Sequence, residues 1–298
     1  MIFPLFVSIF GYAVFSGLWW ISQRYLLTVG VPKSVVLFFS GLSVSLLLIF
    51  SFIKYGLPNL SFELVSLVIV NIILGIIISY CYLSVLSKNE ASLAVSVTAF
   101  APILVIVTGY FILGEKVGIV TSLGIVTILI GTYVMNVSKE KSLYQSLKQI
   151  WHNRSSWLWY AIFAAIASSF AIPIEKHLIG LSNFLFPAGM QLFFGWGIFW
   201  GIWMMYKKEY KFNIKLPLSR VVAVCIIIGI FFAIANAFQG LAYYYGFAAS
   251  VGALKRLDGV VTVILASLIL KEENIHYRLI GIFIVAIGAC LIAFGKVL

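Results

Sequence analysis

The sequence predicts an all-α membrane protein with ten transmembrane helices, arranged as two inverted five-helix repeats. Three observations predict this class: 63% of the residues are hydrophobic and only 10% are charged, apolar runs of about twenty residues recur along the chain, and its two halves share a pattern. Only helices and closed barrels satisfy all their backbone polar groups inside a bilayer. The apolar runs are continuous and do not alternate with polar residues, so we expect helices.

Ten apolar runs, separated by polar breaks, define the predicted spans. They are 3–21, 34–53, 63–85, 91–113, 117–137, 157–179, 183–206, 221–246, 248–270 and 277–295. The one long polar stretch lies in the middle and carries apolar residues on a single helical face, which is typical of an interfacial amphipathic connector. The predicted domains are therefore a first repeat at 1–137, the connector at 138–156 and a second repeat at 157–298.

The two halves match without a gap after the fourth and ninth spans. A single shift superposes Glu115 on Glu272, Gly124 on Gly281, and Gly131 on Gly288. Five spans is an odd number, so the second half must enter the membrane in the opposite sense, as in the inverted repeats of secondary transporters. We expect the two glutamates to cap the helices that follow them, and the glycines to allow close helix approach.

The ninth span contains three charged residues, Lys255, Arg256 and Asp258, in an otherwise apolar segment. A charge near the bilayer centre costs at least ~2.5–3.5 kcal/mol, so such residues indicate a substrate pathway. Lys offers a compact charge, and Arg offers a planar fork suited to two oxygens of a phosphate or carboxylate. The alternative is that Lys255 and Asp258, three residues apart on one face, pair with each other and only hold the bundle together.

Further polar residues lie in other spans. The candidates for substrate binding are Asn236, Gln239 and Tyr243 in the eighth span, Tyr82 in the third, and Arg24 at the end of the first. Interhelical hydrogen bonds, and snorkelling of Arg24 to the interface, would explain the same residues. Glu175, which follows Pro173, is a candidate for carrying a coupling proton, with Asp258 as the second candidate. Both acids could instead be permanent counter-ions of Lys176 and Lys255.

The duplicated turns resemble those of a known family. Leu113-Gly114-Glu115 and Leu270-Lys271-Glu272, the Gly-rich spans after them, and Ala101-Pro102 in the fourth span are similar to ten-helix, EamA-type members of the drug/metabolite transporter superfamily. The resemblance covers nearly the whole chain. It implies a membrane transporter that works by alternating access and does no covalent chemistry.

The ninth span adds a finer resemblance. Residues 250–256 are similar to the ninth helix of plastid triose-phosphate translocators, where a Lys-Arg pair binds phosphate. They are also similar to the Gly-Ala-Leu-Asn-Lys signature of nucleotide-sugar transporters, with Lys255 in place of the Asn and Arg256 in place of the Lys. Both comparisons imply an anionic substrate at this helix. Asp258 departs from this pattern and could neutralise one of the cations.

Composition excludes several other functions. The net charge is +11, but the basic residues lie almost wholly between apolar runs, so we expect no nucleic-acid partner. The three Cys and three His residues show no metal-ligand spacing, and we expect no metal or cofactor. The sequence has no HExxH motif or Gly-rich phosphate loop and shows no nucleophile–base pair, so we do not expect an enzyme.

Loop charges indicate the orientation. Of the 20 Lys and Arg residues, only four fall on the side of the termini, namely Lys54, Lys116, Lys176 and Lys296; all others outside the ninth span fall on the opposite side. The positive-inside rule then places both termini outside the cytoplasm, whereas the family resemblance implies cytoplasmic termini.

We therefore expect an integral, multi-pass protein of a prokaryotic plasma (inner) membrane that carries a small anionic or phosphorylated metabolite, coupled to protons or to counter-exchange. The alternatives are an exporter of amino acids or other neutral or zwitterionic metabolites, and a flippase of lipid phosphates. The expected partners are a small-molecule substrate and membrane lipids, and a homodimer is an open alternative.

Overall fold

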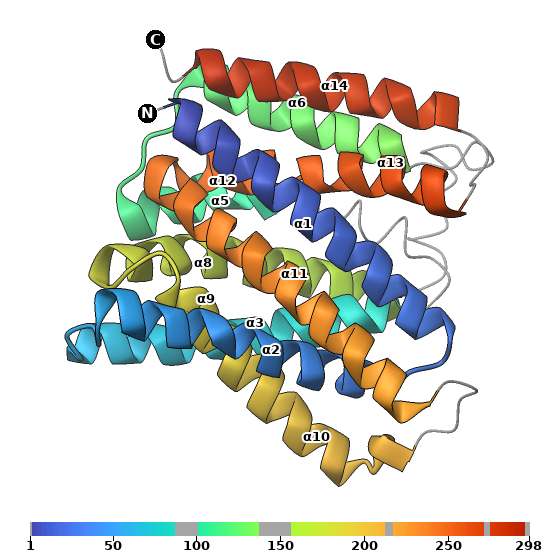
Figure 1. Ribbon diagram of the computed structural model, residues 1–298. Coiled ribbons are helices and arrows are strands. Elements are labelled where there is room, and N and C mark those ends of the chain that lie inside the picture. Colours follow the sequence, from blue (N-terminus) through green and yellow to red (C-terminus); the bar gives the residue numbers. More distant parts are fainter. Residues whose placement is uncertain (1, 87–100, 137–155, 212–216, 271–274, 296–298) are drawn as a thin grey trace.

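The computed structural model describes residues 2–86, 101–136, 156–211, 217–270 and 275–295, and every element in these ranges is a helix (Figure 1). The helices are α1 (Ile2–Thr28), α2 (Lys33–Tyr55), α3 (Phe62–Leu86), α5 (Ala101–Leu113), α6 (Ile119–Asn136), α8 (Ser156–Leu181), α9 (Phe186–Met190), the π-helix η1 (Gln191–Phe199), α10 (Trp200–Tyr206), the short 3₁₀ helix η2 (Glu209–Lys211), α11 (Leu218–Tyr245), α12 (Ala248–Leu254), α13 (Leu257–Leu270) and α14 (Ile275–Phe294). This confirms the all-α class.

Hydropathy explains where the long helices lie. Five helices in the described ranges, namely α1, α2, α3, α8 and α11, are long and apolar enough to cross a membrane by length and composition. The helices α5, α6 and α14 contain shorter apolar stretches. Large apolar side chains such as Phe10, Ile69, Phe111 and Phe283 are exposed on the outside of the bundle, as expected for a surface that faces lipid.

Two predicted spans differ from the uniform α-helices that the sequence suggested. The seventh span consists of α9, the π-helix η1 and α10. The ninth span, predicted as one helix over 248–270, is interrupted at Lys255 and Arg256, between α12 and α13. The predicted connector lies outside the described residues except for Ser156, the first residue of α8, so the division into domains stays a prediction.

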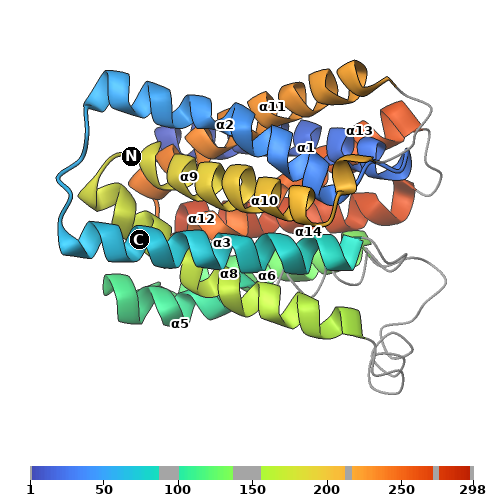
Figure 2. The ribbon, with the colours of Figure 1, turned by 90° about the horizontal axis from the view of Figure 1, so that it is seen from below.

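The packing of the helices follows the pairing expected of an inverted repeat. If α1 corresponds to α8, α3 to α11 and α5 to α13, then each contact has a counterpart: α1 packs against α11 and α13, and α8 packs against α3 and α5. The last helices of the two halves, α6 and α14, lie side by side (Figures 1 and 2). The bundle is therefore built from interleaved helices of both halves.

The contact between α6 and α14 depends on the matched glycines. A Cβ atom at Gly124 would lie 2.8 Å from the carbonyl oxygen of Gly288, and one at Gly131 would lie 2.8 Å from that of Gly281. Gly124 thus meets Gly288, which is the repeat counterpart of Gly131. Gly131 in turn meets Gly281, which is the repeat counterpart of Gly124. This is the pattern of an isologous contact across a two-fold axis.

We predict that Gly131→Ala weakens this contact and destabilises the protein by about 1–3 kcal/mol, the usual cost of overpacking. The new Cβ would lie only 2.6 Å from the backbone nitrogen of Val285, which cannot move freely. Thermal unfolding in detergent measures the effect. Gly180→Ala in α8 is the matched control, because nothing lies within 4 Å of the added atom and Ala favours a helix. Equal stability of the two variants would contradict the role of the glycine contact.

Candidate functional site

The centre of the candidate site is the interruption of the ninth span. Around it, amides bond to carbonyls three residues earlier, not four: Arg256 N to Ala253 O at 3.0 Å and Asp258 N to Lys255 O at 3.0 Å. Gly252 and Gly259 lie on either side of the interruption, and glycine is a weak helix former. The interruption therefore places Lys255 and Arg256 where the regular α-helical pattern breaks, inside the bundle.

Burial changes at this same point. All seven residues of α12 are buried, whereas residues 255–262 are all partly exposed. The small side chains of Ala248, Ala249, Gly252 and Ala253 let α12 pack closely into one of the hydrophobic clusters of the core. Lys255 thus lies at a boundary between tightly packed protein and a more accessible region.

A chain of hydrogen bonds connects Lys255 to Glu175. The Gln239 amide on α11 donates to both carboxylate oxygens of Glu175 on α8, at 2.8 and 3.0 Å. Lys255 in turn donates to the amide oxygen of Gln239. Glu175 and Gln239 are only 6% and 7% exposed. A carboxylate, an amide and an ammonium group from three different helices are therefore joined in the interior.

Pro173 shapes the helix that carries Glu175. Proline has no amide hydrogen, so Pro173 cannot bond to the carbonyl of Ser169 one turn earlier. The hydroxyl of Thr108 on α5 donates to this carbonyl at 2.5 Å. A side chain of the first half thus satisfies the backbone group that the proline leaves free, as is required inside a membrane.

Arg256 and Asp258 face α1 and α3. The hydroxyl of Ser16 on α1 donates to Asp258 Oδ2 at 3.0 Å. Arg256 lies beside Tyr82 of α3 and beside Asp258. The Lys255 ammonium lies 4.9 Å from the ring centre of Tyr12 on α1 and 5.7 Å from that of Tyr243 on α11, within cation–π range. The site therefore combines residues of both halves.

The structure brings together most of the predicted site residues. Glu175, Gln239, Tyr243, Lys255, Arg256, Asp258 and Tyr82 lie in one region. Asn236 donates its amide to Phe232 O of its own helix, at 2.7 Å, and no contact joins it to this network among the described residues. The side chain of Arg24 lies outside the described part of the structure.

Two further residues of the site, Tyr12 and Ser16, were not predicted. They lie one helical turn apart on α1, so a search for polar residues at that spacing could have found them.

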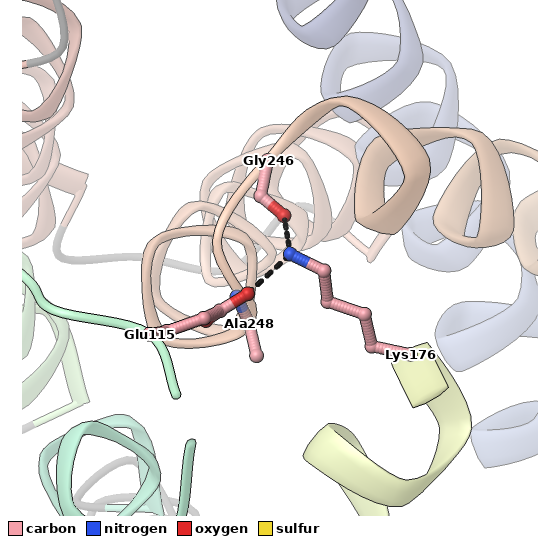
Figure 3. A network of polar contacts seen from close by, with 4 residues as sticks. All are labelled: Glu115, Lys176, Gly246 and Ala248. Carbon is pink, nitrogen blue, oxygen red and sulfur yellow. Dashed lines mark hydrogen bonds and ion pairs between the residues drawn. The ribbon is translucent and has the colours of Figure 1, made fainter. Parts of the chain in front are cut away.

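The expected role of Glu115 as a cap of the following helix is wrong. Its Oε2 accepts the backbone N–H of Ala248, at 2.8 Å, and so caps α12. Its other oxygen pairs with Lys176 of α8 (Figure 3). Glu272 lies outside the described residues.

The formal charges of the site cancel. Lys255 and Arg256 contribute two positive charges, and Glu175 and Asp258 contribute two negative charges. Each base has an acid as an electrostatic neighbour: Glu175 acts on Lys255, and Asp258 acts on Arg256. Within the described ranges, no group of three His, Cys, Asp or Glu side chains is placed to hold a metal ion. The arrangement presents hydrogen-bonding groups and charges of both signs in the interior of the bundle.

Comparisons with known proteins agree with this architecture. The model of the EamA-like transporter family matches residues 4–137, as the resemblance of the duplicated turns predicted. The chain is also similar to a solved crystal structure of a protein, with a TM-score of 0.74 and 15% identity, over 97% of both chains. At this identity the likeness shows the fold alone. None of the curated proteins matches the chain.

We predict that Gln239→Met destabilises the protein by about 1–3 kcal/mol, because the buried Glu175 carboxylate loses the amide that bonds it. Methionine keeps a similar volume, so the loss comes mainly from hydrogen bonding. The matched control is Asn236→Leu on the same helix, α11. It removes a buried amide whose hydrogen bond, among the described residues, is to Phe232 of its own helix. Thermal unfolding compares the two variants, and an equal effect would show that the bridge to Lys255 adds nothing to stability.

Proposed function

We propose that the chain is a secondary transporter that moves a small metabolite across the membrane by alternating access, because the model of the EamA-like transporter family matches residues 4–137. A match to a transporter family favours a transporter over an enzyme. A multi-pass membrane protein follows from the same match and from the apolar helices.

The observation that carries the proposal is the interruption of the ninth span at Lys255 and Arg256. In transporters with inverted repeats, substrates bind near the bilayer midplane, at helices that are discontinuous there. Lys255 lies seven residues from the start of α12, about 10 Å along a helix, which supports a depth near the midplane.

The proposed substrate carries a carboxylate or phosphate group. Lys255 and Arg256 both donate hydrogen bonds and carry positive charge, and Arg suits two oxygens of one such group. In this conformation Lys255 donates to Gln239, so an incoming anion would compete with the amide oxygen for the ammonium. Binding would then also change the environment of Glu175, which the same amide holds.

This competition suggests how transport could be coupled to protons. Gln239 contacts both the proposed coupling acid and the proposed substrate cation, so protonation of Glu175 and occupation of Lys255 would influence each other. Asp258 is the second candidate for the coupling acid because it lies beside Arg256. Counter-exchange of two anions would need neither acid to change its charge.

A zwitterionic or neutral metabolite, such as an amino acid, is the second candidate substrate class. The cancelling charges of the site favour it, because the two acids leave no excess positive charge to attract an anion. Its ammonium group would lie near Asp258 or Glu175, with its carboxylate near Lys255.

The proposal extends to the membrane, orientation and oligomeric state of the protein. Lipids would contact the exposed apolar side chains of the bundle. The prokaryotic plasma (inner) membrane, the outward location of the termini and a homodimer all stay predictions, as does a lipid phosphate as cargo.

We predict that phosphorylated or carboxylated compounds stabilise the purified protein against heat, and that Lys255→Ala/Arg256→Ala removes this effect. A ligand at roughly 100 times its Kd adds about 2.7 kcal/mol of stability if it binds only the folded state. The screen compares anionic, zwitterionic, cationic and lipid-phosphate compounds by thermal unfolding.

Lys54→Ala is the matched control, because Lys54 is exposed and its ammonium group lies over the rings of Phe50 and Tyr55 in the same helix. Stabilisation that persists in the double variant would remove the basic pair from the binding site. Asp258→Asn separates the two substrate classes: it should strengthen the binding of a pure anion and weaken that of a zwitterion.

We predict that Glu175→Gln abolishes transport driven by a proton gradient and leaves exchange of labelled for unlabelled substrate intact. A glutamine cannot carry the proton, but it keeps the size and most of the hydrogen bonding of the side chain. Flux into reconstituted vesicles, with and without a pH gradient, measures both modes once the screen has identified a substrate. Proton-driven transport in this variant would move the coupling role to Asp258 or to counter-exchange.

A further inference from the structure

A second polar network lies at the end of the bundle where α1 begins and α14 ends (Figure 1). We call it the terminal clamp. Its members are Glu115, Lys176, Gly246 and Ala248 (Figure 3). Lys176 pairs with Glu115 Oε1 and donates to the Gly246 carbonyl at 2.5 Å. Glu115 Oε2 accepts the N–H of Ala248 at 2.8 Å.

The terminal clamp joins the two halves of the chain. Glu115 belongs to the first half and lies in the turn between α5 and α6, where Gly114 has a φ of 66°. Lys176 on α8, Gly246 just after α11, and Ala248 at the start of α12 belong to the second half. An alternating-access movement of one half against the other would have to break or stretch these contacts.

The terminal clamp lies on the side of the candidate site where the buried helix α12 packs into the core. The buried helix α12 runs from Ala248, at the clamp, to Leu254, next to Lys255. Leu5 and Ile9 of α1 and Val105 of α5 belong to the same hydrophobic cluster as α12. On the far side of Lys255 the residues are partly exposed. Among the described residues, the side of Lys255 toward the terminal end is therefore closed by tight packing, and the packing is looser beyond Lys255.

Two hydroxyl groups between the clamp and Lys255 are not satisfied in this closed arrangement. Ser250 on α12 and Tyr243 on α11 are both 0% exposed, and their hydroxyl oxygens have no hydrogen-bond partner among the described residues. A buried polar group without a partner is costly, and water relieves this cost. These hydroxyls thus indicate where water would enter if the terminal end opened.

The clamp and the site share one turn of α8. Glu175 and Lys176 are neighbours and point about 100° apart on the helix. Glu175 is linked through Gln239 to Lys255, just beyond the last residue of α12, while Lys176 is linked through Glu115 to its first residue. A change at either end of α12 can therefore reach the other end through α8.

We propose that the terminal clamp is the gate that closes the substrate path toward the terminal end. Opening it admits water and substrate past Tyr243 and Ser250 to Lys255. Glu115 acts as a positioning residue, because it holds the start of the half-helix whose far end carries the proposed substrate cations. This inference rests on the proposed transport function but not on the identity of the substrate.

The test measures access to Ser250 from each side of the membrane. Ser250→Cys is placed in a variant whose three native cysteines, Cys81, Cys225 and Cys290, are replaced by alanine. A membrane-impermeant maleimide is added separately to each face of reconstituted vesicles, and the rate of labelling is followed. We expect slow labelling from the terminal side with the clamp intact. We expect Glu115→Gln to raise this rate by about tenfold, a typical size for coupling between linked sites.

Matched variants distinguish a gate from a general loosening. Lys176→Gln should act in the same direction as Glu115→Gln, and it is the second variant if the first folds poorly, because Lys176 is 22% exposed and its replacement is milder. Glu63→Gln removes another polar contact between the halves, that of Glu63 with His177 at 2.8 Å, but it does not touch α12. It should leave the labelling rate unchanged.

Three results would overturn the proposal: fast labelling from the terminal side with the clamp intact, no change in either clamp variant, or an equal rise in Glu63→Gln. The measurement uses no substrate. If the compound screen with Lys255→Ala/Arg256→Ala fails, the labelling still reports on the gate, so the two failures can be told apart.

Discussion

The need to satisfy charged groups inside an apolar bundle governs the centre of this protein. Four charged residues lie within or beside helices that are otherwise almost wholly apolar: Glu175 in α8, Asp258 in α13, and Lys255 and Arg256 between α12 and α13. They are tolerated because each meets a group of another helix: an amide, a hydroxyl, an aromatic ring or an opposite charge. These contacts fix where α1, α3, α8 and α11 lie around the interrupted ninth span, so the site and the packing of the bundle depend on the same interactions.

The short helix α12 is the element on which the proposed mechanism depends. It has only seven residues, all of them buried, and α8 is linked to both of its ends. A helix this short has little stability of its own, so its position follows from what holds its ends. In the proposed mechanism, Glu115 therefore acts on the two basic residues on the far side of α12 without touching them.

Much of the fold could be predicted from the sequence, because apolar length alone determines where helices can cross a membrane. The Lys-Arg pair was also visible, since charges are rare in such segments. The interruption between α12 and α13 was not, because hydropathy says nothing about which carbonyl each amide bonds to. Glu115 was assigned to the wrong helix for a related reason: capping rules use neighbours in sequence, whereas Ala248 is 133 residues away. The spacing of Tyr12 and Ser16 on α1 was visible in the sequence, but only tertiary packing shows that they contact Lys255 and Asp258.

The glycine contacts between α6 and α14 bear on the origin of the chain. Gly124 meets Gly288 and Gly131 meets Gly281, so each helix presents the same pair of small residues to the other. A five-helix protein with both glycines in its last helix could form this same interface with a second copy inserted upside down. Joining two such copies end to end would preserve the interface and remove the need for a partner. The fold is thus compatible with descent from an antiparallel dimer by gene duplication and fusion.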